Sequence, residues 1–128
     1  MKPFHLAVVM LAFVIAPATA QTADATPQYK ACLLNGDSMM ERRKCASDEL
    51  QRQKALLNTE YKITAARASV ADRTGLEKAQ KAWLDFRNLD CDTKAASVHG
   101  TGSADMYFEC MLLHIQLRRA QLESYWLL

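Results

Sequence analysis

No proline occurs after Pro27 in this chain of 128 residues. Because proline interrupts helix interiors and central strands, the rest of the chain is free to form long elements. Beyond residue 20, valine and isoleucine are scarce, whereas Ala, Leu, Gln, Lys, Arg and Glu dominate. These are the residues that lose least on becoming helical. The sequence therefore predicts an all-α domain.

The first 20 residues have a different character. Lys2 precedes an unbroken apolar run over residues 6–15, and Ala18-Thr19-Ala20 has the small-x-small pattern of a signal-peptidase site. The run is shorter than the roughly 20 apolar residues that span a membrane. Residue 21 is Gln rather than Cys, so nothing marks a lipid attachment site. We predict a signal peptide over residues 1–20 and a periplasmic or secreted mature protein.

Removal of this segment leaves 108 residues with 15 basic and 14 acidic side chains, enough for one domain. The nearly neutral balance argues against a nucleic-acid-binding protein, which needs a concentrated basic face. No second long apolar run is present, so no membrane span is expected. Residues 21–28 are polar and contain Pro27, which predicts a flexible N-terminal arm. Residues 29–128 form the predicted helical domain.

Turn and capping residues mark the end of the first helix and the start of the second. A short helix over about residues 29–34 is expected to end at Asn35-Gly36, in a left-handed cap. Ser38 and Glu41 have the spacing of a capping box, in which each side chain satisfies the other residue's backbone amide. This box opens a long second helix that is expected to run toward Ala71.

The same reasoning predicts two further long helices. Thr74 and Glu77 form a second possible capping box, and the helix that they open should end near Val98. Ser103 is expected to cap the last helix, with Asp105 in its first turn, where a carboxylate meets the positive end of the helix dipole. Short connections make successive helices antiparallel, which predicts a small up-and-down bundle of one short and three long helices.

Apolar residues spaced three and four apart predict the buried faces of the long helices. They are Ala46, Leu50, Leu57, Tyr61 and Ala65 in the second helix, Leu76, Ala79, Trp83 and Phe86 in the third, and Met106, Cys110, Leu113, Leu117 and Ala120 in the fourth.

The four cysteines indicate a disulfide-stapled domain, because an even number in a small exported chain is typical of such domains. Cys91 lies seven residues before Val98 and Cys110 lies seven after Ser103, so the two should face each other on antiparallel helices. Cys32 and Cys45 flank the first turn in a similar way. We predict the pairs Cys32–Cys45 and Cys91–Cys110. An alternative is a zinc site built from Cys91, His99, Cys110 and His114, which an oxidising compartment disfavours.

Several strings together carry a family resemblance: Leu57-Asn58-x-x-Tyr61, Ala79-Gln80-Lys81-Ala82-Trp83-Leu84-x-Phe86-Arg87-x-x-x-Cys91, Gly100-Thr101-Gly102-Ser103, and Cys110-Met111 with Arg118 eight residues beyond Cys110. Their order and spacing resemble the LprI-like family of small exported bacterial proteins, named for a lipoprotein that inhibits lysozyme. The resemblance covers about residues 32–122 and implies an exported helical domain that inhibits a lysozyme. The chain departs from the family at Thr101, which separates two glycines that are usually adjacent.

Two groups of polar residues are candidates for function. Gln80, Trp83 and Arg87 share one helix face, and Asn58 and Tyr61 could point toward them. We interpret this group as a structural hydrogen-bond network, because polar groups inside a bundle must be paired; a polar binding groove is the alternative. The second group would gather near the last turn and bind another protein: Asp90, Asp92, His99, Ser103, Asp105 and Glu109.

No catalytic arrangement is evident, since no Ser–His–Asp set and no phosphate-binding loop occurs and nothing pins two carboxylates across a cleft. We predict a protein-binding domain that is not an enzyme and needs no metal or cofactor. Its expected partner is a lysozyme-type peptidoglycan hydrolase, whose substrate cleft it would occlude. The alternatives are an immunity protein against a secreted cell-wall toxin and a structural or envelope-stress module without an enzyme target.

Overall fold

The computed structural model describes residues 25–126, so the predicted signal peptide and residues 21–24 of the predicted arm lie outside the described residues. Four helices follow one another: α1 (Pro27–Asn35), α2 (Met39–Arg67), α3 (Val70–Ser97) and α4 (Gly102–Glu123). Residues 25–126 contain no strand. The prediction of an all-α domain with one short and three long helices is confirmed. Pro27 and Gln28, assigned to the flexible arm, instead form the first turn of α1.

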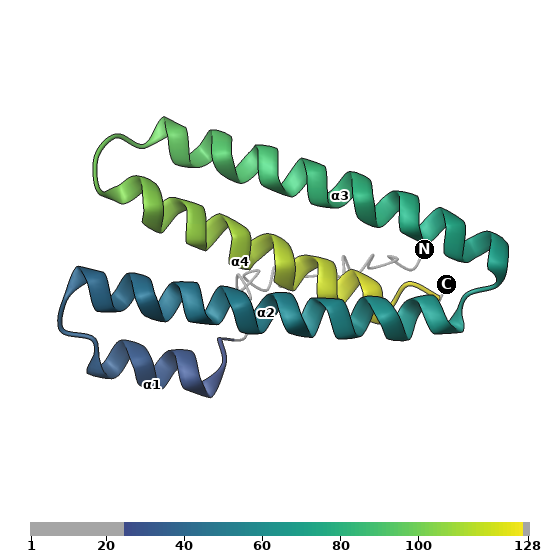
Figure 1. Cartoon of the computed structure of the whole chain (residues 1–128), viewed down its shortest axis with the longest axis horizontal. Coiled ribbons are helices and arrows are strands. Elements are labelled where there is room, and N and C mark those ends of the chain that lie inside the picture. The colour runs from purple at the N-terminus through teal and green to yellow at the C-terminus, as the bar shows by residue number, and fades with distance from the viewer. Residues whose placement is uncertain (1–24, 127–128) are drawn as a thin grey trace, which may run out of the picture.

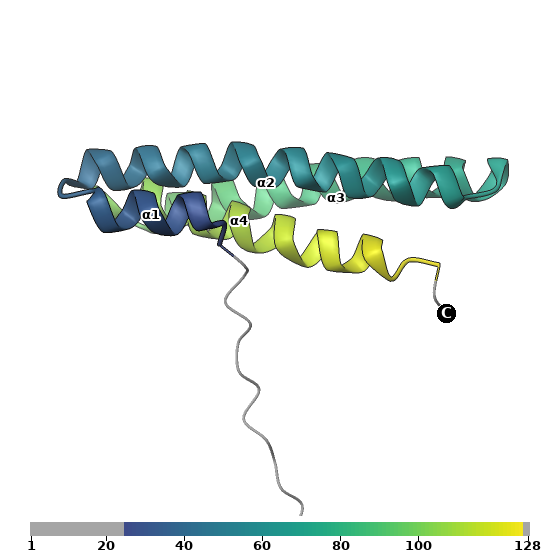
Figure 2. The same ribbon diagram turned by 90° about the horizontal axis from the view of Figure 1, so that it is seen from below.

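The long helices form two layers, with α4 as the central element. α2 and α3 run antiparallel in one layer, and α4 lies against both of them from the other side (Figures 1 and 2). Extensive packing joins α4 to α2 and α4 to α3, while α1 packs along α2. α2 and α3 make no comparably extensive contact with each other. One side of the α2–α3 layer is therefore open between the two helices.

The core follows from this arrangement, because α4 contributes side chains to both of its neighbours. One core cluster of buried apolar residues draws on all three long helices: Leu50, Leu57, Leu76, Cys91, Cys110, Met111, Ile115 and Leu122. The buried face predicted for α2 is confirmed at Ala46, Leu50 and Leu57. Within residues 25–126, no helix is long and apolar enough to cross a membrane.

The buried face predicted for α4 is confirmed at Cys110 but was wrong at Leu113 and Leu117. Leu113 and Leu117 are about half exposed, at 49% and 55%, and the helix buries Met111, Ile115 and Leu122 instead. The face is rotated by about one residue, or 100°. Arg118 lies on the buried face and interrupts its apolar pattern. The adjacent face, with Leu113 and Leu117, therefore showed the clearer apolar periodicity in the sequence. In α3, Phe86 was likewise expected in the core and is 57% exposed.

The start of α2 is as predicted. The Ser38 hydroxyl accepts a hydrogen bond from the Glu41 backbone amide at 3.2 Å, and the Glu41 carboxylate accepts one from the Ser38 amide at 2.8 Å. The left-handed cap predicted at Gly36, at the C-terminal end of α1, was wrong. Gly36 has a φ of −88° and continues into the turn in an extended conformation.

The predicted starts of α3 and α4 were also wrong. Ser69 caps α3 by accepting from the Asp72 amide at 3.2 Å, and Thr74 lies inside the helix. α2 ends at Arg67 rather than near Ala71, so the cap of the next helix lies earlier than predicted, at Ser69. In α4, Ser103 is already helical, and its hydroxyl donates to the Ala95 carbonyl at 2.9 Å rather than capping the helix.

Both predicted disulfides are confirmed. Cys32–Cys45 joins α1 to α2 with a Cα–Cα distance of 5.7 Å, and Cys91–Cys110 joins α3 to α4 with one of 5.5 Å. α3 ends at Ser97 with Val98 as its cap, which agrees with the predicted boundary. The second disulfide thus staples the helical hairpin that carries the α3–α4 connection.

Candidate functional site

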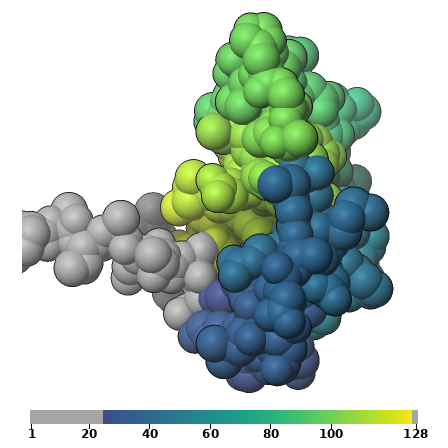
Figure 3. Space-filling model, turned by 90° about the vertical axis from the view of Figure 1, so that its left-hand side faces the viewer, coloured from purple at the N-terminus to yellow at the C-terminus, as the bar shows by residue number. Residues whose placement is uncertain are grey.

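The α3–α4 connection is an exposed turn at one end of the molecule. Figure 3 views this end and shows the connection projecting beside the N-terminal end of α2. His99 is exposed, and Gly100 has a φ of +81°, a backbone conformation that suits glycine. The turn is therefore both accessible and held in a conformation that few other residues would adopt.

Three contacts hold this turn in place. The Arg43 guanidinium of α2 donates to the backbone carbonyl of Thr101 and forms an ion pair with Asp105, at 3.1 Å from Nε to Oδ1. The hydroxyl of Ser103 donates back to Ala95, the last turn of α3. Together with the disulfide between the two helices, these contacts preorganise the turn. We call residues 99–103 the hairpin tip.

Of the predicted acidic residues, Asp105 and Glu109 line the same hollow beside α1, whereas Asp90 and Asp92 do not line it. Asp105 is neutralised by Arg43 at the hairpin tip. Glu109 lies on the side of α1, where it lines a hollow of about 600 Å³ together with Tyr29. Burial, followed by the negative charges of Glu49 and Glu109, raises the pKa of Tyr29. Asp92 is exposed on α3. The structure therefore brings Asp105 and Glu109 to one hollow and leaves Asp92 elsewhere, on α3.

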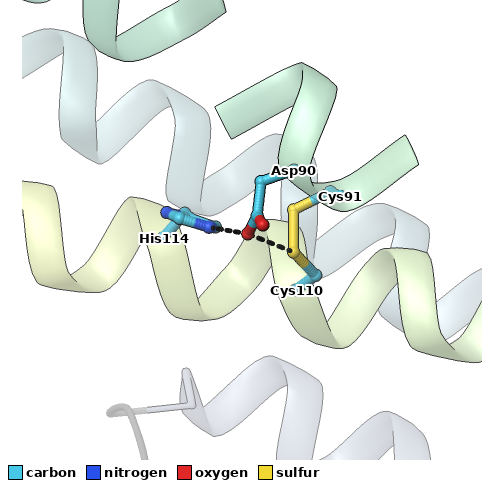
Figure 4. A group of neighbouring side chains, drawn as sticks. All are labelled: Asp90, Cys91, Cys110 and His114. Carbon is cyan, nitrogen blue, oxygen red and sulfur yellow. Dashed lines mark hydrogen bonds and ion pairs between the residues drawn. A yellow bond between two sulfur atoms is a disulfide. The ribbon is translucent and has the colours of Figure 1, made fainter. Parts of the chain in front are cut away.

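Asp90 is bound to two cationic or basic groups. Its Oδ2 atom lies 2.8 Å from Lys94 Nζ and 2.8 Å from His114 Nε2 (Figure 4). Hydrogen bonds from Lys94 and His114 hold the pKa of Asp90 below its usual value. The ring of Phe86 meets that of His114 edge-on, with 5.5 Å between centroids. Asp90 therefore links α3 to α4 rather than standing free on the surface.

The zinc alternative placed Cys91, Cys110 and His114 in one ligand set with His99. The structure brings the first three together, but the fourth neighbour is Asp90, with ligand atoms within 4.8 Å of one another. The two sulfur atoms are joined in a disulfide and cannot act as thiolate ligands in this state (Figure 4). The cysteines therefore serve as a structural staple.

The residues predicted as a polar network do lie together, but with different partners. Among the described contacts, Arg87 and Gln80 are not bonded to each other. Arg87 donates to Asn88 Oδ1, at 3.2 Å from Nε and 2.8 Å from Nη2. Gln80 instead accepts from Arg118 Nε of α4 at 2.9 Å. Both guanidinium groups lie over Trp83, 5.0 Å and 5.8 Å from its centroid.

Asn58 and Tyr61 face the same region from α2. With Gln80 and Arg87 they line a groove of about 520 Å³ between α2 and α3. Arg118 was quoted in the family resemblance without a role, and sequence reasoning missed its burial at 8% exposure. The available signal was its position at helical spacing from Met111 and Ile115, on the face that α4 buries.

Comparison with known families matches residues 18–122 to a family described as lysozyme inhibitor LprI. No curated protein and no solved structure shows a significant match. The family consists of inhibitors rather than enzymes, which fits the prediction of a non-catalytic protein. The match extends over all three long helices and both disulfides, apart from the last residue of α4. The chain therefore belongs to the lysozyme inhibitor LprI family.

Proposed function

We propose that this protein binds a lysozyme-type peptidoglycan hydrolase and blocks its substrate cleft with the hairpin tip. The family supports the target, since its description is that of lysozyme inhibitors. The clamped, exposed turn at residues 99–103 is the observation that supports the mode of binding. A convex element that is already ordered loses little conformational entropy when it enters a concave site.

The contacts around the tip favour shape over charge as the basis of recognition. Asp105 is paired with Arg43, and Asp90 with Lys94 and His114, so these carboxylates are already neutralised within the chain. Asp92 and Glu109 are the exposed acidic side chains that remain for contacts with a basic enzyme. His99 and Ser103 are the two ends of the hairpin tip. The exposed His99 would contact the cleft, and Ser103 would support the tip through its hydrogen bond to Ala95.

The proposed location is the periplasm or the exterior. Two disulfides and the family indicate an extracytoplasmic protein. The predicted signal peptide over residues 1–20 is consistent with export, and its cleavage near Ala20 belongs to the same proposal.

A lysis assay with purified mature protein tests this function. Wild type is expected to protect peptidoglycan from at least one lysozyme class. The double variant His99→Ala/Thr101→Ala should weaken protection by about tenfold or more, the effect of one well-buried interface contact. The matched control is Arg67→Ala/Val70→Ala, which alters exposed residues at the opposite α2–α3 connection. This control should inhibit as wild type does.

The outcomes separate the target from the mode of binding. If wild type protects but the tip variant protects equally well, the hairpin tip is not the contact surface. If wild type gives no protection at large molar excess against several lysozyme classes, the proposed target is wrong.

A further inference from the structure

Two arginine side chains are buried around Trp83, and no carboxylate of residues 25–126 neutralises them. Arg87 is 6% exposed and Arg118 is 8% exposed. Across residues 25–126, no acidic side chain forms an ion pair with either guanidinium group. A buried charge is costly unless it is paired, so two such cations in a small domain suggest a role beyond packing.

In the described part of the chain, the groups that contact these cations are neutral acceptors and aromatic rings. Arg87 is held by the Asn88 amide and the face of Trp83. Arg118 is held by the Gln80 amide, by Gln121 and by the same tryptophan, and its Nη2 atom is buried without a hydrogen-bond partner in the described part of the chain. Burial lowers the pKa of both guanidinium groups. Within the described residues, the positive charges of Arg87 and Arg118 and the Nη2 donor of Arg118 are therefore not compensated.

Arg87 borders the groove between α2 and α3, whose volume of about 520 Å³ matches that of a small-molecule site. Arg87 and Gln80 both line the groove, and each has one hydrogen-bond donor without a protein acceptor among the described contacts. These donors are Nη1 of Arg87 and Nε2 of Gln80. Tyr61 and Asn58 face the groove from the opposite helix. The groove thus combines a cation, side-chain amides and an aromatic ring.

Charge is distributed unevenly along the groove. Arg87 and Lys54 lie toward the same end, because α2 and α3 are antiparallel (Figure 1). Lys54 has no ion-pair partner within residues 25–126, whereas Lys81 is paired with Asp85 at 3.1 Å. Glu77, the acidic residue of the groove, precedes Arg87 by ten residues, about 15 Å along the helix. An anionic group would therefore be favoured at the Arg87 end.

We propose that this groove binds a small acidic sugar, with its carboxylate at Arg87 and Lys54 and its ring toward Tyr61. The planar guanidinium group suits a carboxylate, which can accept two parallel hydrogen bonds. Asn58 and Gln80 offer amide groups to sugar hydroxyl or acetamido groups. The site lies about 15 Å along α3 from the hairpin tip, measured from Arg87 to Ser97. It is therefore independent of the lysozyme contact proposed above.

Two sugars that differ by one carboxylate provide the test. N-acetylmuramic acid carries a lactyl carboxylate, and N-acetylglucosamine lacks it. Titration of isotope-labelled mature protein with each sugar is followed by amide chemical shifts and by the Arg87 Nε–H signal. The acidic sugar should shift residues of the groove in α2 and α3 in a saturable manner, with an affinity about tenfold or more above that of the neutral sugar, as expected for one charge-assisted contact.

Variants then locate the carboxylate. Arg87→Gln should lower the affinity for the acidic sugar to that for the neutral one, with folding checked by thermal unfolding. Lys54→Gln, which changes a side chain at the rim, should weaken binding several-fold and keeps the test valid if Arg87→Gln fails to fold. Lys44→Gln makes the same charge change in α2 outside the groove and should leave the affinity unchanged.

Three results would overturn the proposal. The first is the absence of saturable shifts with either sugar. The second is equal affinity for the two sugars, which would show that the carboxylate is not recognised. The third is competition by inorganic phosphate at the same concentration as the sugar, which would show that the groove attracts anions without recognising the sugar ring. No outcome depends on lysozyme, so the inhibitor proposal stands or falls separately.

Discussion

At the scale of single residues, the domain buries charge in two different ways. Glu49 is 1% exposed and accepts hydrogen bonds from the backbone and side chain of Thr26, from Gln53 and from Arg52. It anchors the start of α1 to α2. Within residues 25–126, the buried arginines beside Trp83 have no such ionic partner. The first arrangement serves the fold, and the second carries the ligand site proposed above.

The satisfied anion gives the fold an acid dependence. Burial of Glu49 raises its pKa, but hydrogen bonds from Thr26, Gln53 and Arg52 outweigh burial and leave the pKa below its ordinary value. A carboxyl whose pKa is lowered by folding stabilises the native state above the unfolded pKa, and this stability is lost as pH falls through the folded value. We expect Glu49→Gln to cost about 1–3 kcal/mol near pH 7, and less near pH 3. Urea unfolding at several pH values measures the difference.

Asp85→Asn is the matched control, because it removes one negative charge from an exposed pair with Lys81. Such pairs contribute about 0–1 kcal/mol, so this variant should stay close to wild type throughout. If Glu49→Gln shows the same small, pH-independent effect as the control, the Glu49 hydrogen bonds do not stabilise the native state.

The sequence placed Arg87 in a polar network inside the bundle, but it did not indicate that Glu49 and Arg118 are buried. Glu49 and Arg118 occupy helix positions where charged residues are usually solvated. Their burial depends on which neighbouring helix covers them, and that is a tertiary property. The grouping of Gln80, Trp83 and Arg87 was predictable, because their spacing alone places them on one helix face. Their hydrogen-bond partners were not.

At the scale of helices, local sequence features predict that a helix exists more reliably than they predict where it begins and ends. The capping box of Ser38 and Glu41 was identified because a glycine turn immediately precedes it. The start of α3 was misplaced because Ser69 with Asp72 and Thr74 with Glu77 both have the required spacing. The choice between them depends on where α2 ends, at Arg67, which no residue marks clearly. The α3–α4 connection was placed correctly by its two glycines.

The two disulfides should differ in what they stabilise. Cys32–Cys45 fastens α1, which has no buried residue of its own, to α2. Cys91–Cys110 lies in the core, with Cys91 fully buried and Cys110 only 5% exposed. We expect Cys91→Ala/Cys110→Ala to lower the free energy of unfolding of α2–α4 by about 3 kcal/mol or more. Cys32→Ala/Cys45→Ala should lower it less and instead release α1.

Urea unfolding with amide hydrogen exchange distinguishes these effects. The Cys32–Cys45 variant should lose protection in α1 and retain it in α3 and α4, while the Cys91–Cys110 variant should lose protection throughout the long helices. Each double variant serves as the control for the other, since both remove two cysteines. Equal loss of global stability in the two variants would contradict a peripheral role for α1.

At the scale of the whole molecule, the sequence predicted the helices and their staples but not the layers. Loop lengths and the Cys91–Cys110 spacing were enough to place α3 antiparallel to α4. That α4 would lie against both α2 and α3, leaving a groove between them, was hidden because Arg118 interrupts its apolar face. The sequence offered a polar binding groove at Gln80 and Arg87 only as an alternative, and its place between α2 and α3 comes from the structure.

The charges of the whole molecule nearly balance, and they also balance locally. The chain carries 16 basic and 14 acidic side chains, and Asp105 and Asp90 are paired with Arg43 and Lys94. A basic partner would therefore experience little long-range attraction. Electrostatic steering raises association rates only where the charges of one partner are left uncompensated.

Association with a basic lysozyme should accordingly be almost independent of salt. Raising the salt from about 0.05 to 0.5 M shortens the Debye length from roughly 14 to 4 Å, and the association rate should change less than about threefold. Surface plasmon resonance with immobilised lysozyme measures it. Lys94→Gln, which leaves Asp90 with His114 alone, should associate faster at low salt and show a steeper salt dependence. A wild-type rate that falls more than about tenfold would instead assign the steering to Asp92 and Glu109, and would show that charge rather than the shape of the hairpin tip governs the encounter.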